Sequence, residues 1–244
     1  MIQQVKAELL KIRSTRTTVG IVLGMVALVL LFSLLSGLLT KAPNLMRTED
    51  QRGLLSVGSL AGVFSALAGI MLVTSEYRFG TIRPTFLFTP RRSRVVGAKL
   101  AAGLLAGIVF GVVGEGLGFA IGYATLAGRG IDYALDTGQT ALLLLGTLAG
   151  VALWGALGVG IGMVVRNQVG AIIGLLAWGF VVENLLFAFV PSVGRFAPTH
   201  SSDALIGLTT THLLPAAAGG VMLLAWTIAF ALAAVAAAAR RDVN

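Results

Sequence analysis

Residues 100–126 read LAAGLLAGIVFGVVGEGLGFAIGYATL, an apolar run with a single charged residue, Glu115. A helix needs about 20 mostly apolar residues to cross a bilayer, so this run predicts a membrane span. Five more runs of this kind occur, at 18–39, 54–75, 140–165, 169–190 and 215–239. The sequence therefore predicts an all-α polytopic membrane protein, with residues 1–244 forming a single transmembrane domain of six spans.

Glycines recur along 100–126 at intervals of four residues, the spacing that lets two helix backbones approach closely. The two series are Gly103, Gly107 and Gly111, then Gly114, Gly118 and Gly122. A further string, GVGIG at 158–162, lies inside another apolar run. We interpret these glycines as helix-packing surfaces, and interpret the three tryptophans within the spans as packing residues too: Trp154, Trp178 and Trp226.

The composition agrees with a membrane protein and excludes several other classes. The chain has 244 residues, 57% of them hydrophobic and 11% charged, and a mean hydropathy of +0.92. Its net charge of +8 does not indicate nucleic-acid binding, because membrane proteins keep lysine and arginine in cytoplasmic loops. The absence of cysteine excludes disulfides, Cys-ligated zinc, iron–sulfur clusters and thiol nucleophiles.

The distribution of basic residues predicts the topology. With six spans both termini share one side, and 13 of the 18 lysines and arginines then fall on that side. Cytoplasmic loops carry this excess, so both termini are expected in the cytoplasm.

Residues 1–16 place Ile2, Val5, Leu9 and Ile12 on one helical face, which predicts an amphipathic helix in the inner interface. The alternative is a basic flank without fixed structure.

The charge gathers in the loop EYRFGTIRPTFLFTPRRSRVVGAK, residues 76–99, which has seven charged residues. Within it Thr81 can cap a helix, Pro84 is tolerated in a first turn, and Pro90 ends the helix. A short helix with an aromatic face, Phe86 and Phe88, is therefore predicted, and a partner protein could bury that face. The alternative is a loop whose arginines only enforce topology while its phenylalanines dip into lipid.

This loop resembles the cytoplasmic loop between the second and third spans of ABC-2 type transporter permeases. The resemblance rests on Glu76, Tyr77 and Arg78, on Gly80–Thr81, on the TPRRSR string at 89–94, and on Lys99. It extends to the length of the chain, the helix at 1–16, the six spans, and a proline-containing outer loop at 191–214 that includes PSVGRFAPTHSSDALIGL. Pro84 departs from the family pattern, in which another residue is usual.

The resemblance implies an ABC-2 fold, like that of type V exporters, in a bacterial plasma membrane. It implies that two copies of this chain pair as a homodimer and recruit two copies of a separate ATPase subunit, which binds ATP and magnesium. It also implies that a coupling helix docks into the ATPase. The residues expected in that role are Gly80, Thr81, Ile82, Arg83, Pro84, Thr85, Phe86, Leu87, Phe88, Thr89, Pro90, Arg91, Arg92 and Arg94.

The chain itself carries no sign of a nucleotide site. A phosphate-binding loop needs a glycine directly before a lysine that Ser or Thr follows, and none of Lys6, Lys11, Lys41 and Lys99 meets this pattern. We therefore expect no enzyme activity, no catalytic residue, and no cofactor or metal in this chain.

Two acids lie within predicted spans, Glu115 and Glu183, and Asn184 follows the second. A charge at membrane depth costs about 2.5 to 3.5 kcal/mol on insertion scales, so such residues face a bundle interior or a watery path. We expect Glu115, which glycines flank, to fix packing. The resemblance to ABC-2 permeases implies that the fifth span lies near the dimer interface and the substrate route, so we expect Glu183 and Asn184 to lie near a substrate pathway. The alternative is that Glu183 only fixes packing.

The function expected from these features is outward transport of a hydrophobic or amphipathic substrate, such as a lipid, drug or natural product, driven by the ATPase. One alternative is an ion-coupled secondary transporter that uses Glu115 and Glu183 as coupling carboxylates. Another is a non-transporting membrane anchor or sensor subunit for an ATPase. Membrane lipid is an expected partner in each case, and nucleic acid in none.

Overall fold

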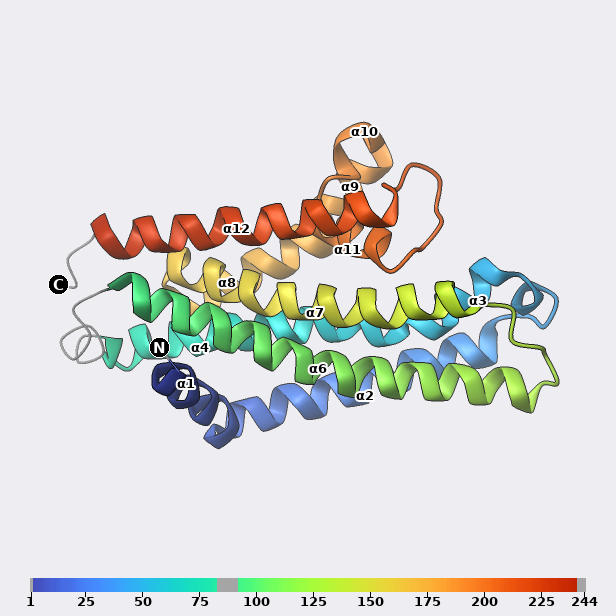
Figure 1. The fold of residues 1–244 in the computed structure, drawn as a ribbon, viewed down its shortest axis with the longest axis horizontal. Coiled ribbons are helices and arrows are strands. Elements are labelled where there is room, and N and C mark those ends of the chain that lie inside the picture. The colour runs from blue at the N-terminus through green and yellow to red at the C-terminus, as the bar shows by residue number, and fades with distance from the viewer. Residues whose placement is uncertain (1, 83–91, 241–244) are drawn as a thin grey trace.

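The computed structural model describes residues 2–82 and 92–240. All regular secondary structure in this part of the chain is helical (Figure 1). Six helical segments are long and apolar enough to cross a membrane, which confirms the predicted all-α class and number of spans. These segments are Arg16–Leu39, Thr48–Arg78, Arg92–Gly128, Thr137–Val165, Gln168–Phe189 and Ala216–Ala239.

Some spans are single helices and others are built from several elements. The first, third, fourth and sixth are α2 (Arg16–Leu39), α6 (Arg92–Gly128), α7 (Thr137–Val165) and α12 (Ala216–Arg240). The second joins α3 (Thr48–Leu55), the 3-10 segment η2 (Ser56–Leu60) and α4 (Ala61–Arg78). The fifth joins α8 (Gln168–Ala177), the π-helical segment η3 (Trp178–Val182) and α9 (Glu183–Phe189).

The remaining elements lie outside the spans. Helix α1 (Ile2–Ser14) covers most of the residues for which an N-terminal helix is predicted, and its place at a membrane interface stays a prediction. The residues of the outer loop at 191–214 form two short helices, α10 (Pro191–Gly194) and α11 (Pro198–Leu205), and α11 packs against α7 and α12. A 3-10 turn, η1 (Asn44–Met46), precedes α3.

Two spans begin earlier than hydropathy predicts, at Thr48 instead of residue 54 and at Arg92 instead of residue 100. Helix α3 carries Glu49 and Asp50 in its first turn, where acids favour a helix because they complement its dipole. Helix α6 contains Arg92, Arg94 and Lys99 in its first turns. A prediction from hydropathy leaves such charged residues outside the span. In the structure Lys99 lies within the helix, because it has partners of opposite charge that are described below.

Local signals explain where α7 begins and how the chain turns from α7 into α8. The side chain of Asp136 accepts from the backbone N–H of Gln139 at 2.8 Å, and the Gln139 side chain accepts from the N–H of Asp136 at 3.2 Å, a capping box. At the other end Arg166 turns the chain in the left-handed region, and the Asn167 side chain accepts from the Gly170 N–H to start α8.

The centre of the bundle is α4, α6 and α7, and glycines bring these helices together. A Cβ atom at Gly69 or Gly103 would collide with the carbonyl oxygen of Gly155, and one at Gly158 with that of Ala66. Gly107, Gly114 and Gly118 likewise lie against backbone atoms of neighbouring segments, as their spacing predicts. Spans α2, α8–α9 and α12 are much less buried and form the periphery.

The bundle has two ends of different character. We call the end that holds α1, the last turn of α4, the first turns of α6 and the last turn of α12 the basic end (left in Figure 1). We call the end that holds α3, residues 129–136 and the segment after α11 the far end. There the buried Gln51 donates to the carbonyls of Leu45 and Asp132 at 2.8 Å each, and its side-chain oxygen accepts from the Ala134 N–H at 2.9 Å.

Candidate functional site

The basic end contains the two flanks of the loop that sequence analysis singles out. Gly80, Thr81 and Ile82 are described on one flank, and Arg92 and Arg94 on the other. The other residues predicted to couple to a partner lie outside the described residues, together with the short helix predicted there: Arg83, Pro84, Thr85, Phe86, Leu87, Phe88, Thr89, Pro90 and Arg91.

Helix α4 ends in a defined turn just before the loop. The backbone N–H of Phe79 donates to the Ser75 carbonyl at 2.9 Å, and Gly80 follows with φ +70°, in the left-handed region that favours glycine. Ile82 is buried, so the chain packs against the rest of the bundle again immediately after the turn. The first flank is therefore anchored on both sides of Gly80.

Four charged side chains meet between these flanks, and we call Glu8, Lys11, Glu76 and Lys99 the charge cluster. The Lys99 ammonium donates to Glu76 Oε1 at 2.8 Å and to Glu8 Oε2 at 3.0 Å. The Lys11 ammonium donates to the same Glu76 Oε1 at 2.7 Å and to Glu8 Oε1 at 3.0 Å. Two positive and two negative charges thus form a closed ring of ion pairs that links α1, α4 and α6.

Burial makes this ring different from a surface salt bridge. The side chain of Lys99 is 0% exposed, those of Glu8 and Glu76 are 7% and 6% exposed, and that of Lys11 is half-exposed. Burial alone lowers the pKa of Lys11, but its hydrogen bond to Glu76 and the charges of Glu8 and Glu76 outweigh burial and raise that pKa above its ordinary value. Lys11 therefore stays charged at neutral pH.

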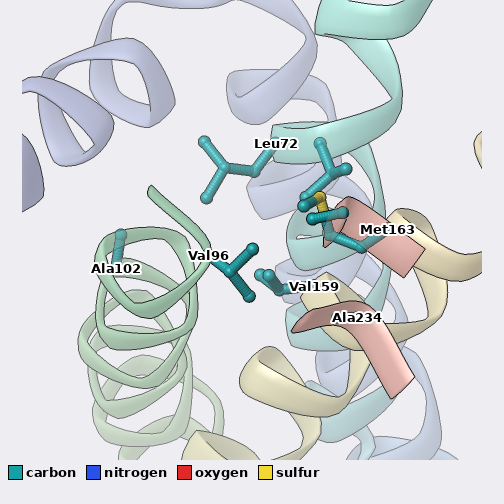
Figure 2. Packing of buried hydrophobic residues seen from close by; sticks show 8 residues of the cluster. Leu72, Val96, Ala102, Val159, Met163 and Ala234 are labelled. Carbon is teal, nitrogen blue, oxygen red and sulfur yellow. The ribbon is translucent and has the colours of Figure 1, made fainter. Parts of the chain in front are cut away.

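The sequence places Glu8 on the apolar face of its helix. Glu8 lies three residues after Val5 and four before Ile12, and so within the apolar stripe of α1. Leu9 and Ile12 of that helix pack on a core formed by α4, α6, α7 and α12, whose members Leu72, Val96, Ala102, Val159, Met163 and Ala234 are shown in Figure 2. Docking of α1 on this core carries Glu8 to Lys99.

Two arginines join the last span to the same end. Arg92 Nη1 donates to the Ala238 carbonyl at 2.9 Å, and Arg166 Nη2 donates to the Ala237 carbonyl at 2.7 Å. Both carbonyls belong to the last turn of α12, where a helix leaves carbonyls without partners and favours positive charge. The Arg166 guanidinium also lies 5.3 Å from the centre of the Tyr77 ring. The loop flanks are thereby connected to α7 and α12 as well as to α1.

Glu115 is isolated in the middle of the bundle. It is 2% exposed and lies against Gly58 of the 3-10 segment η2. The Thr147 hydroxyl is near its carboxyl group, but neither carboxyl oxygen completes a hydrogen bond within the described part of the chain. A buried polar group without partners is costly and marks either tight packing or a function such as proton binding.

Glu183 connects the fifth span to the outer segment. It is 0% exposed, and its Oε2 accepts from the backbone N–H of Thr199 at 2.8 Å. Thr199 is in the first turn of α11, whose N-cap residue, Ala197, has no side chain that could accept this hydrogen bond. His200 lies 4.0 Å from the same oxygen and stacks on Phe187. These contacts are those of a residue that holds α11 in place.

Asn184 does not share this environment. It is exposed, and its amide donates to the carbonyls of Gly179 at 3.1 Å and Phe180 at 3.2 Å, inside the π-helical segment. The structure therefore does not bring Asn184, Glu183 and Glu115 into one polar path among the described residues. A role for any of them in transport stays a prediction.

Sequence reasoning on its own does not single out Glu8 or Lys11 as site residues, although a signal for them exists. A charged residue within an apolar helical stripe indicates a buried partner, and Glu8 and Lys11 are three residues apart, a spacing at which helical side chains can pair. The same reasoning applies to Lys99, which lies among Val95, Val96 and Ala102 on the buried face of α6.

Comparison with known proteins adds no assignment: neither a family model nor a curated protein matches this chain.

Proposed function

We propose that this chain is the membrane-spanning subunit of an ATP-driven exporter of the ABC-2 kind. A separate ATPase subunit docks on residues 80–94 and supplies the chemistry on ATP and magnesium. Two copies of this chain pair in a bacterial plasma membrane, with both termini cytoplasmic, and move a hydrophobic or amphipathic substrate outward. The observation that best supports this proposal is the charge cluster, because it ties both flanks of the loop to one another.

The cluster explains how force on the loop would reach the spans. Glu76 lies in the last turn of the second span and Lys99 in the first turns of the third, and their direct ion pair holds the two helices together. Glu8 and Lys11 add α1 to this unit, while Arg92 adds α12. When the ATPase dimer closes on ATP and shifts the loop, α1, α4, α6 and α12 move together, and this movement changes which side of the membrane the pathway faces.

The test is co-purification. This chain is expressed with ATPase subunits encoded beside it, purified through a tag on this chain alone, and assayed for ATP hydrolysis. We expect activity to follow the tag, and to be lost when Phe86, Phe88 and Arg91 are all replaced by alanine.

The matched control replaces an equal number of exposed residues away from the basic end, Met46, Arg47 and Phe189, and should retain the activity. If no ATPase follows the tag, or if both triple variants lose it equally, the proposal is wrong.

One observation favours a second candidate, an ion-coupled transporter. Glu115 is buried with both carboxyl oxygens lacking a hydrogen-bond partner among the described residues, as a proton-binding carboxyl would be. Transport in proteoliposomes that depends on a pH gradient, needs no ATP and is abolished in Glu115→Gln would establish this candidate. Transport that needs ATP and survives Glu115→Gln would reject it.

A further inference from the structure

All three tryptophans of the chain come together around one cavity. Trp154 of α7, Trp178 of η3 and Trp226 of α12 line a cavity of about 300 Å³. Sequence analysis interprets them as packing residues, yet they leave space between them. We propose that this cavity binds one acyl chain of a membrane lipid.

The lining contains no charged side chain and matches a hydrocarbon ligand. One face of α7 provides Trp154, Leu157, Ile161 and Val165, and α8 provides mostly small residues. The polar atom of one tryptophan is already used, because Trp226 Nε1 donates to the Phe196 carbonyl at 2.8 Å. An apolar cavity of this kind does not attract water and takes apolar molecules, and its volume lies at the lower end of the range for ligand sites.

The length of the cavity fits the acyl chain of a lipid in one leaflet of the bilayer. Its lining runs along α7 from Val165 to Trp154, a distance of about 16 Å at 1.5 Å per residue. This is about half of the 30 Å hydrocarbon thickness of a bilayer. The Val165 end adjoins the polar turn of Arg166 and Asn167 at the basic end, and the other end reaches Trp154 and Trp226 near the middle of the span. A lipid of the leaflet at the basic end would thus place its head group by the turn and its chain along the cavity.

The position of the cavity makes lipid its natural occupant. It lies beside the fifth span, of which only 6% of residues in the apolar window are buried within the protein. Helix α8 packs on α4 and α7, α12 packs on α7, and residues of all three of α7, α8 and α12 line the cavity, so the cavity lies over α7 between α8 and α12. An unfilled cavity loses dispersion contacts along its walls, and a lipid chain restores them.

Gly174 offers a way to fill the cavity without disturbing the helix. It lines the cavity, and a Cβ atom built there meets nothing within 4 Å. Gly116 of α6 is the matched control, because it is also a helical glycine with no neighbour within 4 Å but does not line the cavity. Leucine at either position lengthens a side chain into open space, and only Gly174→Leu occupies the cavity.

The reporter is Trp154, which is 7% exposed and therefore shielded from bulk lipid. In a protein with Trp178→Phe and Trp226→Phe, Trp154 is the only source of tryptophan fluorescence. We compare its emission in bilayers of phosphatidylcholine with bilayers of the same lipid brominated in mid-chain, because bromine quenches tryptophan only at contact.

We expect the brominated bilayer to quench Trp154 by at least half. Gly174→Leu should remove most of this quenching, and Gly116→Leu should leave it unchanged, with equal thermal unfolding of the three proteins as the check on folding. Equal emission in the two bilayers, or equal quenching in Gly174→Leu, would overturn the proposal. Quenching that is lost only when the protein density in the bilayer is high would also overturn the proposal, because a second copy of the chain would then cover the cavity.

This inference does not depend on the proposed export function. The measurement uses neither ATP nor an ATPase subunit, so a negative result leaves the export proposal intact. Failure of an ATPase to co-purify would in turn leave the lipid site intact.

Discussion

The two ends of the bundle are held together by different kinds of interaction. At the basic end four full charges, Glu8, Lys11, Glu76 and Lys99, are paired with one another, and all but the half-exposed Lys11 are buried. At the far end the buried neutral Gln51 joins η1 to residues 132–134 through three hydrogen bonds to backbone groups, and Arg52 donates to the Gly207 carbonyl.

This difference has a physical consequence. A hydrogen bond from a neutral amide contributes modestly and independently of other side chains. A buried charge is tolerated only while its partner stays in place, so removal of one partner affects every member of the ring. The hydrogen bonds at the far end therefore hold connecting segments in place locally. The ion pairs at the basic end make the positions of several helices depend on one another.

The largest expected effect is that of Lys99→Met. It leaves Glu8 and Glu76 buried with only the half-exposed Lys11 as a counter-charge, and breaking a buried ion pair costs about 3 to 5 kcal/mol of unfolding free energy. Denaturant unfolding in detergent micelles measures this loss.

The triple variant Lys99→Met, Glu8→Gln, Glu76→Gln is the control for Lys99→Met, because it removes the unpaired charges and should recover much of the stability. If Lys99→Met unfolds like the wild type, the basic end is not held by charge and the contrast between the ends fails.

A smaller effect is expected for Gln51→Leu at the far end. The substitution leaves the carbonyls of Leu45 and Asp132 and the N–H of Ala134 without their side-chain partner, at a cost of about 1 to 3 kcal/mol. The same unfolding measurement gives the stability loss. If the proposed ATPase subunit co-purifies with this chain, its stimulation should be unchanged in Gln51→Leu and reduced in Lys99→Met. Equal loss of stimulation in both variants would remove the functional distinction between the ends.

The smallest effect concerns the pH dependence of stability at α11, the helix that precedes the far-end segment. Burial raises the pKa of Asp203 to about 6, so the folded protein favours the protonated carboxyl. The folded state then binds more protons than the unfolded state between about pH 4 and pH 6, and stability falls as the pH rises through this range.

Asp203→Asn removes the carboxyl group whose ionisation lowers the stability of the folded state. It should raise the unfolding temperature at pH 8 by a few degrees but have little effect near pH 4. Burial lowers the pKa of the neighbouring His200, which acts in the opposite direction, so His200→Gln is measured in parallel. An unfolding temperature of Asp203→Asn that follows the wild type at every pH would show that this carboxyl does not contribute.

Much of the bundle could be predicted from the chain alone. Apolar runs of sufficient length require helices that satisfy their own backbone groups in lipid, and this accounts for all six spans. Glycine spacing in 100–126 predicts close helix contacts, and Gly103, Gly107, Gly114 and Gly118 make them. Gly80, read as the start of the coupling segment, has the left-handed conformation that ends α4.

The starts of two spans and most of the candidate site could not be predicted in this way. Hydropathy assigns each charge a fixed cost, so it begins the third span only after Arg92 and Lys99, and it leaves Glu8 in an unpartnered amphipathic helix. The actual cost depends on partners: Lys99 is fully buried because Glu8, 91 residues away, and Glu76, 23 residues away, meet it in space.

The sequence by itself thus determined the class of the protein, the number of spans and the small-residue surfaces, because these follow from the solvent and from the spacing of residues along one helix. Only the tertiary structure decided that α1 docks on the bundle, that Glu183 holds α11, and that three tryptophans surround one cavity. Each of these depends on which residues distant in the chain share a contact, and the energy of a buried charge or an open cavity is set by such contacts.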